Sequence, residues 1–126
     1  MKTLEQQFAS TIYHQVSQYG EQHSLQSDER KKYGSMAHKL PMLVKTAGLV
    51  QALAFVSSRG KDPHKALLEH LAFVVTDNNT GDFLLQSQNA EIQDYIYLTK
   101  RTMLALKWYK RFAQSILKVE PATEGD

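Results

Sequence analysis

Apolar residues recur every three or four positions along most of this chain, and this spacing strongly limits what the chain can fold into. Between Thr3 and Gly20 the first series keeps the period of an α-helix, with Leu4, Phe8, Ile12, Val16 and Tyr19 as its members. Thr3 followed three residues later by Gln6 is the pattern of a capping box, which marks the start of a helix. No segment shows the sustained two-residue alternation of a half-buried strand. The sequence therefore predicts an all-α protein.

Turn and capping residues divide the first half of the chain. Ser27 is expected to cap a second helix that runs towards Leu40. Because proline is tolerated at the first position of a helix and disfavours helix in the residue before it, a third helix is predicted from Pro41 to Gly60. This third segment is apolar nearly all round, so we expect it to be the central helix of the fold.

The second half of the chain gives three more helices. Asp62 followed by Pro63 predicts the start of a fourth helix, which should end before the turn residues at 77–81. A short helix is expected near Phe83, and Asn89 is expected to cap a long amphipathic helix over residues 90–119. The predicted fold is one all-α domain, 1–126: a bundle of five to six helices with a central apolar helix, a long C-terminal helix and a disordered tail at 120–126.

Charge is unevenly distributed along a chain whose formal net charge is only +2. The segment 30–65 carries eight Lys or Arg against one acid, and the segment 100–118 carries six and no acid. Segregated basic surface is typical of proteins that bind the phosphate backbone of a nucleic acid. The alternative is that both segments are ordinary solvated helix faces.

The last predicted helix carries its cations on one line. At 100° per residue, Lys100, Lys107, Arg111 and Lys118 share one side, and apolar residues occupy the opposite side. Leu104 and Trp108 lie beside the cationic line, one turn apart. They are predicted to contact another subunit or a stacked base. Coverage of Trp108 by a neighbouring helix of the same bundle is the alternative.

The sequence carries no recognisable motif for catalysis or cofactor binding. The chain has no Cys, its five His show no metal-ligand spacing, and Gly60-Lys61 lacks the rest of a phosphate-binding loop. No apolar run reaches the roughly 20 residues of a membrane span, and the N-terminus does not resemble a signal peptide. We therefore expect a cytoplasmic protein that is not an enzyme and uses no metal or cofactor.

Two blocks of residues resemble a known family. The first holds Tyr33, Lys39-Leu40-Pro41, Gly48-Leu49, Gln51-Ala52-Leu53-Ala54-Phe55 and Ser58-Arg59-Gly60-Lys61; the second holds Tyr95, Leu98-Thr99-Lys100-Arg101 and Leu106-Lys107-Trp108-Tyr109-Lys110-Arg111-Phe112-Ala113. Their order and separation resemble the small all-helical subunit of the type III-B CRISPR RNA-guided effector, the Cmr complex.

The resemblance implies a noncatalytic subunit that stacks in several copies beside the filament holding the guide RNA. It also implies partners: other subunits of the complex, further copies of the chain, and guide and target RNA. Basic faces would line the path of the target RNA, and the matched basic positions are Lys39, Arg59, Lys61, Lys100, Arg101, Lys107, Lys110 and Arg111.

Two other interpretations stay open at this point. A helix-turn-helix DNA-binding regulator would also be small, helical and basic, but the segment after Leu40-Pro41 is too apolar to face a DNA groove. A purely structural interaction subunit, such as the small subunit of the related type III-A complex, would keep the helices without binding RNA. Salt-dependent binding of RNA separates these interpretations.

Overall fold

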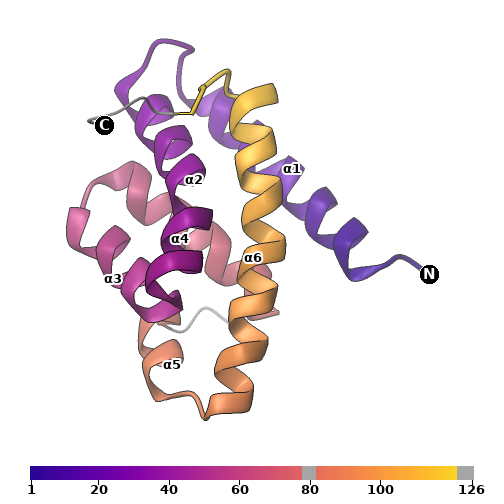
Figure 1. Cartoon of the computed structure of the whole chain (residues 1–126). Coiled ribbons are helices and arrows are strands. Elements are labelled where there is room, and N and C mark those ends of the chain that lie inside the picture. The colour runs from indigo at the N-terminus through magenta and orange to yellow at the C-terminus, as the bar shows by residue number, and fades with distance from the viewer. Residues whose placement is uncertain (78–81, 122–126) are drawn as a thin grey trace.

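Six helices account for most of the described chain, as the computed structural model shows for residues 1–77 and 82–121 (Figure 1). They are α1 (Leu4–Gln22), α2 (Asp28–Ala47), α3 (Leu49–Arg59), α4 (Asp62–Val75), α5 (Phe83–Asn89) and α6 (Ile92–Ser115). No strand occurs within these residues. The predicted all-α bundle with a long C-terminal helix is confirmed.

Side-chain caps start two of the helices where the sequence predicted. The Thr3 side chain accepts a hydrogen bond from the Gln6 N–H, and the Gln6 side chain accepts one from the Thr3 N–H, which completes the capping box of α1. Ser27 Oγ accepts from the Arg30 N–H at 3.2 Å and caps α2. These bonds pair N–H groups of the first turn, which have no partner inside the helix.

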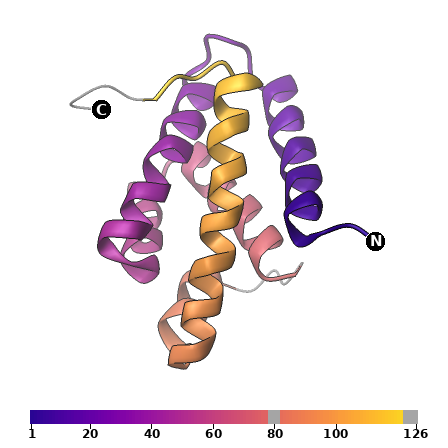
Figure 2. The same ribbon diagram turned by 45° about the vertical axis from the view of Figure 1, so that its right-hand side comes forward.

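The long helix α6 occupies the middle of the bundle. It lies between α1 and α2, with α4 behind it (Figure 2), and its inner face packs against all three. Leu106 and Tyr109 on α6 are fully buried, as are Ile12 on α1, Tyr33 on α2 and Leu67 on α4. The hydrophobic core therefore follows the axis of α6.

The predicted helix at 41–60 is wrong, because the break lies at Gly48. Helix α2 runs through Pro41, which has no N–H to donate within the helix. Burial of Leu40 and Val44 on the core face offsets the loss of that hydrogen bond. Gly48 has φ +92° and ψ 163°, a backbone conformation open essentially to glycine alone, and α3 starts directly after it. The central position expected for this apolar segment belongs to α6.

Only one side of the segment 41–60 faces the core. Leu49 and Leu53 are buried, whereas Met42 of the same apolar segment is 61% exposed, because the break at Gly48 changes the direction of the chain. Gly48 provides no side-chain cap for α3. The Tyr95 hydroxyl of α6 accepts a hydrogen bond from the Val50 N–H at 3.1 Å and supplies a cap from outside the segment.

Both predicted ends of the last helix are also corrected. Asn89 is the last residue of α5, and Glu91 is the N-cap of α6. Helix α6 ends at Ser115, so the chain turns back before the predicted end at 119, with Lys118 at φ +62°. In the tail predicted at 120–126, residues 122–126 lie outside the described part of the chain.

The segment after α6 packs against α2. A Cβ added at Gly34 would lie 2.5 Å from Cβ of Val119, so only glycine leaves room for this contact. The Val119 carbonyl accepts a hydrogen bond from Nε2 of His38 at 2.7 Å. The last described residues therefore cover the middle of α2.

Candidate nucleic-acid interface

Basic side chains from two helices and from the turn before a third surround one hollow of about 450 Å³. Helix α2 contributes Lys31, Lys32 and Lys39, α3 contributes its last residue Arg59, and Lys61 stands just before α4. The remaining lining residues are Ser35, Met36, His64 and Val119. The structure thus brings together three of the predicted RNA-binding residues, Lys39, Arg59 and Lys61.

Local geometry explains why these cations meet. Lys32 and Lys39 are seven residues apart on α2, which places them on the same face two turns apart. Gly60 adopts a left-handed conformation, with φ +66°, and this tight turn brings Arg59 and Lys61 to the same end of the α3–α4 pair. The Arg59 guanidinium lies 5.1 Å from the centre of the Phe55 ring, a contact that restrains it.

The histidine at the wall of this hollow reports the local electrostatics. His64 is 6% exposed, and burial lowers its pKa. The charges of Arg59, Lys32, Lys39 and Lys61 lower this pKa further. Asp28 offsets part of this positive charge, because it forms an ion pair with Lys32. The space in front of His64 is consequently positive, and its imidazole favours the neutral form.

The predicted cationic line on α6 is only partly available. Lys100, Lys110 and Arg111 are exposed and have no ion-pair partner in the described part of the chain. Lys107 is also exposed, but it forms an ion pair with Glu5 of α1 and lies over the Trp108 ring. Lys118 lies beyond the end of α6, so it does not extend the line as predicted.

Arg101 is not on this surface, which corrects its prediction as an RNA contact. Its side chain is 7% exposed and lies over the Phe8 ring. Its guanidinium donates to the Val75 carbonyl at 2.9 Å, to the Tyr97 hydroxyl at 3.1 Å and to Asp77 Oδ1 at 2.8 Å. Arg101 therefore holds the end of α4 to α6, and its donors are committed within the chain.

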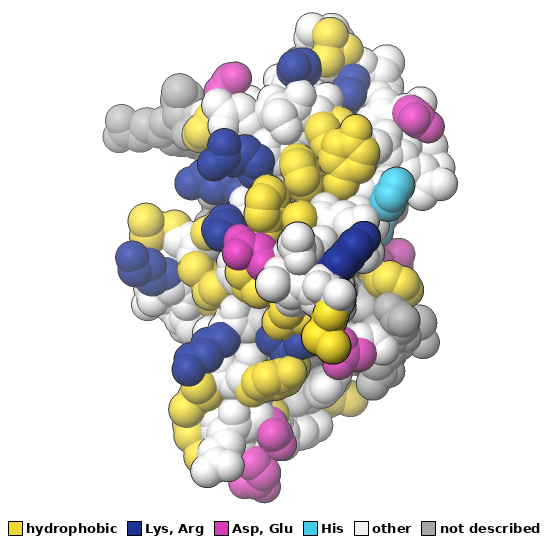
Figure 3. Space-filling view, turned by 90° about the vertical axis from the view of Figure 1, so that its right-hand side faces the viewer, with side chains coloured by type: hydrophobic (Ala, Val, Ile, Leu, Met, Phe, Trp, Pro, Cys, Tyr) yellow, Lys and Arg dark blue, Asp and Glu magenta, His cyan; other side chains and the backbone are white. Residues whose placement is uncertain are grey.

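The predicted interface pair, Leu104 and Trp108, is half-buried at the surface of α6. Both side chains pack against the edge of the core, so the covering helix considered for Trp108 hides it only in part. The Phe112 ring centre is 5.6 Å from that of Trp108 and 5.6 Å from that of Tyr13 on α1. Figure 3 shows hydrophobic side chains gathered over α1 and α6 with Lys and Arg around them. An apolar patch remains open to a partner here.

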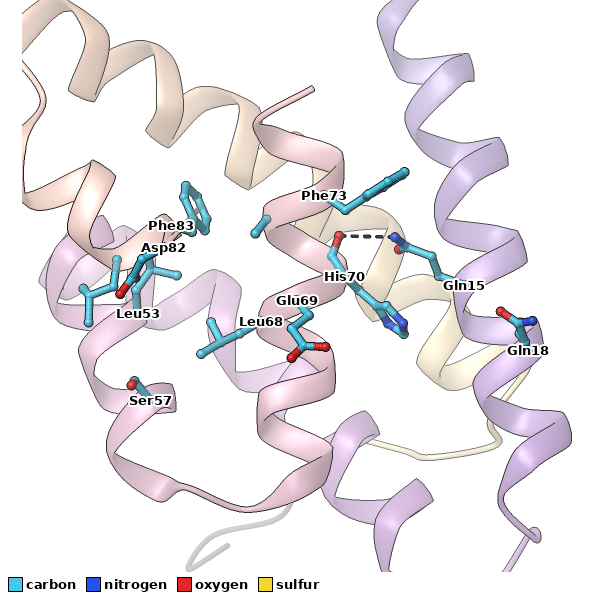
Figure 4. A pocket seen from close by; sticks show the side chains of 12 residues that line it. Gln15, Gln18, Leu53, Ser57, Leu68, Glu69, His70, Phe73, Asp82 and Phe83 are labelled. Atoms are coloured by element: carbon cyan, nitrogen blue, oxygen red, sulfur yellow. Dashed lines mark hydrogen bonds between the residues drawn. The ribbon is translucent and has the colours of Figure 1, made fainter. Parts of the chain in front are cut away.

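A second hollow, of about 670 Å³, separates α1 from α4 and extends towards α3 and α5 (Figure 4). Gln15 Nε2 donates to the His70 carbonyl across it at 3.2 Å. Nδ1 of His70 lies 2.7 Å from the Tyr33 hydroxyl, and burial lowers the His70 pKa to about 4. This imidazole is neutral at pH 7 and already has a partner, so it joins helices and is a poor general base.

The described residues hold neither a metal cluster nor a membrane span. No group of three or more His, Asp or Glu side chains in residues 1–77 and 82–121 is arranged to hold a metal ion. Among these residues, no helix combines the length and the hydropathy needed to cross a bilayer.

Sequence reasoning missed Lys31, Lys32 and His64 as part of the basic hollow. The spacing of Lys32 and Lys39 could have revealed their shared face of α2. His64 gave no such signal, because the sequence alone does not show that the Gly60 turn places the start of α4 opposite α2.

Fold and surface together define a small all-helical protein whose basic side chains gather around one hollow. The family model described as "CRISPR-associated protein (Cas_Cmr5)" matches residues 4–116, and the chain belongs to this family. It is 40% identical to "CRISPR system Cmr subunit Cmr5" of Thermus thermophilus over 118 residues, which are 94% of this chain and 99% of that protein.

A solved structure agrees with this assignment. The crystal structure of a CRISPR-associated Cmr5 family protein from Thermus thermophilus superposes with a TM-score of 0.79 at 40% identity, covering 92% of this chain and 98% of that one. The family resemblance drawn from the two sequence blocks is confirmed.

Proposed function

We propose that the chain is the noncatalytic small subunit of a cytoplasmic type III-B CRISPR RNA-guided effector complex. In this complex it stacks in several copies and contacts the backbone of target RNA through its basic helix faces. Membership of the family and the name of the Thermus relative, a Cmr subunit, support the assembly. The observation that carries the RNA contact is the convergence of Lys39, Arg59 and Lys61 on one hollow.

The surface suits RNA whose sequence is read by base pairing. Lysine and arginine neutralise phosphates, and such contacts position a strand without carrying sequence information. A subunit beside a guide–target duplex needs only this kind of contact. The exposed Lys100, Lys110 and Arg111 of α6 add a second group of available cations. Each copy in a stack would thus offer two groups of phosphate contacts.

The test is charge reversal in the reconstituted complex. In one variant Lys39, Arg59 and Lys61 are changed to Glu, and in another Lys100, Lys110 and Arg111 are changed to Glu. If each cation meets one phosphate, each triple variant should weaken target-RNA binding about equally for unrelated sequences. It should also reduce the slope of log affinity against log salt by about 2.

A matched control distinguishes the loss of specific contacts from the effect of a changed net charge. Lys2, Lys45 and Lys65 are exposed cations outside both groups, so changing all three to Glu gives the same change in net charge. Affinity and salt slope that fall equally in the control would show only a general charge effect. No change in either test variant would contradict RNA contact and favour the purely structural subunit.

Assembly has its own test at the aromatic patch. Trp108→Ala should weaken incorporation into the complex, because truncating an aromatic anchor at an interface commonly costs about 2 kcal/mol or more of binding free energy. Incorporation is measured by copurification with the other subunits. Ile96→Ala, at an exposed apolar position of the same helix, is the control and should incorporate normally. Unchanged incorporation of Trp108→Ala would remove this patch from the interface.

The DNA-binding regulator is not supported. Helix α2 continues through Leu40 and Pro41, so the turn that a helix-turn-helix motif needs there is absent from the described structure.

A further inference from the structure

We propose that the basic hollow between α2 and the α3–α4 turn seats one phosphodiester group of an RNA backbone, and that His64 takes up a proton when the phosphate is seated. The inference rests on the proposed function for its ligand. It adds a defined phosphate-binding site and a linkage between RNA binding and proton uptake. Contact with the RNA backbone alone requires neither of these.

The cations of the hollow converge from different elements of the fold. Lys31 and Lys39 lie on α2, and Arg59 and Lys61 flank the turn between α3 and α4; none of these four has an ion-pair partner in the described residues. Side chains of the same charge repel one another, so their approach around one hollow is stabilised by an anion between them. A phosphate oxygen can accept from lysine and arginine donors at once.

His64 gives an independent observation at the same place. Its Nδ1 is enclosed and has no hydrogen-bond partner in residues 1–77 and 82–121, although the ring lines the hollow. Buried polar groups are normally hydrogen-bonded, so an unpartnered buried imidazole calls for an explanation. The protonated imidazole is positively charged, and an anion in the hollow would give it a negatively charged neighbour.

The start of α4 is also open to an anion. The N-cap residue Lys61 makes no side-chain capping bond, so the first turn of this 14-residue helix keeps unpaired N–H groups. His64 belongs to this first turn, directly after Asp62 and Pro63. The dipole of α4 therefore adds to the positive potential of the side chains.

The direction of the proton linkage follows from the charges that face His64. Lys32 and Lys39 on α2, Arg59 on α3 and Lys61 before α4 all lower its pKa, and Asp28 is paired with Lys32. A phosphodiester brings one negative charge and offsets part of this repulsion, so it raises the pKa of His64. By linkage, RNA must bind more tightly as the pH falls towards that raised pKa.

Other titratable groups near the hollow are Asp62 at the start of α4 and His38 on α2. Asp62 is exposed at the first turn, and His38 donates to the Val119 carbonyl at the wall. Because His38 lies close to the same hollow, the measurement must resolve the individual histidine rings.

The experiment is an NMR titration of the imidazole nitrogens in the full chain, between pH 5 and 8, with and without millimolar hexauridylate. The pKa of His64 should rise by about 0.5–1 unit in the presence of RNA, which corresponds to roughly threefold to tenfold tighter binding at low pH. The exposed His14 is the internal control and should not change. An unchanged or lowered His64 pKa at RNA concentrations that shift other resonances overturns the inference, and so does the absence of any response.

A second arm uses inorganic phosphate in place of RNA. If phosphate raises the His64 pKa and hexauridylate does not, the hollow takes a free anion and the assignment to RNA is overturned. In the variant arm, His64→Asn should remove the pH dependence of hexauridylate binding between pH 5.5 and 7.5 and keep its salt slope. A double variant, Lys39→Gln with Arg59→Gln, keeps His64. In this variant the RNA-induced change in the His64 resonances should be at least threefold smaller than in the wild-type protein.

The two proposals fail differently. If the reconstituted complex loses RNA affinity only when Lys100, Lys110 and Arg111 are reversed, and the His64 pKa does not respond, the proposed function stands and the seat is wrong. If no basic variant alters RNA binding by the complex, the proposed function itself is wrong.

Discussion

Lys100 and Arg101 show how two basic residues at adjacent positions take different roles. Lys100 is exposed, whereas the guanidinium of Arg101 is buried and satisfied by three partners. One of these partners, the Val75 carbonyl, lies in the last turn of α4, where carbonyl groups have no partner within the helix. The arginine thus closes the C-terminal end of α4 from a neighbouring helix.

Arg101→Met should destabilise the fold without acting on RNA directly. The change leaves the Val75 carbonyl unpaired and removes the guanidinium from the Phe8 ring, so we expect the free energy of unfolding to fall by roughly 2–4 kcal/mol. Denaturant unfolding of the purified chain measures it. Lys110→Met, at an exposed position of the same helix, is the control and should stay within about 0.5 kcal/mol of wild type. Equal stability of both variants would show that the Arg101 contacts contribute little.

Adjacent residues on a helix point 100° apart, so a basic motif does not say which of its members face solvent. The sequence placed Lys100 and Arg101 together in one RNA-binding block, and only the packing of α4 against α6 separates them. Conversely, the side of this helix opposite the cationic line was predicted to be apolar, and Tyr109 and Ala113 on that side are buried. The apolar face of the helix could be predicted from the sequence. Which cation is bound by partners within the chain could not.

Gly48 and Gly60 delimit α3, and they do so by different backbone conformations. Gly60 is left-handed, with φ +66° and ψ 5°, which other residues reach at modest cost. Gly48, at φ +92° and ψ 163°, lies in a region that is essentially restricted to glycine. The backbone conformation at the start of α3 therefore requires glycine more strictly than the conformation at its end.

Gly48→Ala should cost roughly 2–3 kcal/mol of folding free energy and Gly60→Ala about 1 kcal/mol. Space is sufficient at both sites, because an added Cβ would lie 3.5 Å from Tyr95 Oη at Gly48 and would meet nothing within 4 Å at Gly60. Paired thermal and denaturant unfolding of the two variants gives the difference. Equal losses would mean that the conformation at Gly48 is relieved by a shift of the chain.

Helix starts were predicted well where a side chain caps the backbone, as at Thr3 and Ser27. Breaks were predicted poorly where two signals competed. At Pro41 the local preference for a break was overridden by burial of its neighbours, and the true break at Gly48 was read as an interior glycine of a helix. The basic hollow was half predicted: Lys39, Arg59, Lys61 and a turn at Gly60 were named, but the packing of this turn against α2 was not.

At the scale of the whole molecule, buried and partly buried polar side chains join four helices. The Tyr109 hydroxyl of α6 donates to Gln15 Oε1 of α1 at 2.5 Å, Gln15 in turn donates to the His70 carbonyl of α4, and the His70 ring contacts the Tyr33 hydroxyl of α2. Tyr33 stacks on Tyr19, with ring centres 4.3 Å apart. Charge on His70 would therefore disturb the centre of the bundle.

The chain should lose stability in mild acid through this residue. The His70 pKa is lowered from 6.5 to about 4, so between these values the unfolded state binds more protons and stability falls as the pH falls. The free energy of unfolding should fall by roughly 2–3 kcal/mol over this pH range. His70→Asn keeps a polar partner for Tyr33 and cannot take up the proton, so its unfolding free energy should change less between pH 7 and 4.5. Exposed His14→Asn is the control, and equal acid sensitivity of both variants would contradict the assignment.

The central place of α6 also bears on how this protein emerges from the ribosome. Helices α1, α2 and α4 all bury apolar faces against the last helix, and Val119 fills the space left by Gly34. Until roughly the last quarter of the chain has been made, the earlier helices lack the surface that covers them, and isolated helices of this length are marginal in water. Completion of the core therefore waits for the synthesis of α6, and a chain that stops before this helix leaves apolar surface exposed.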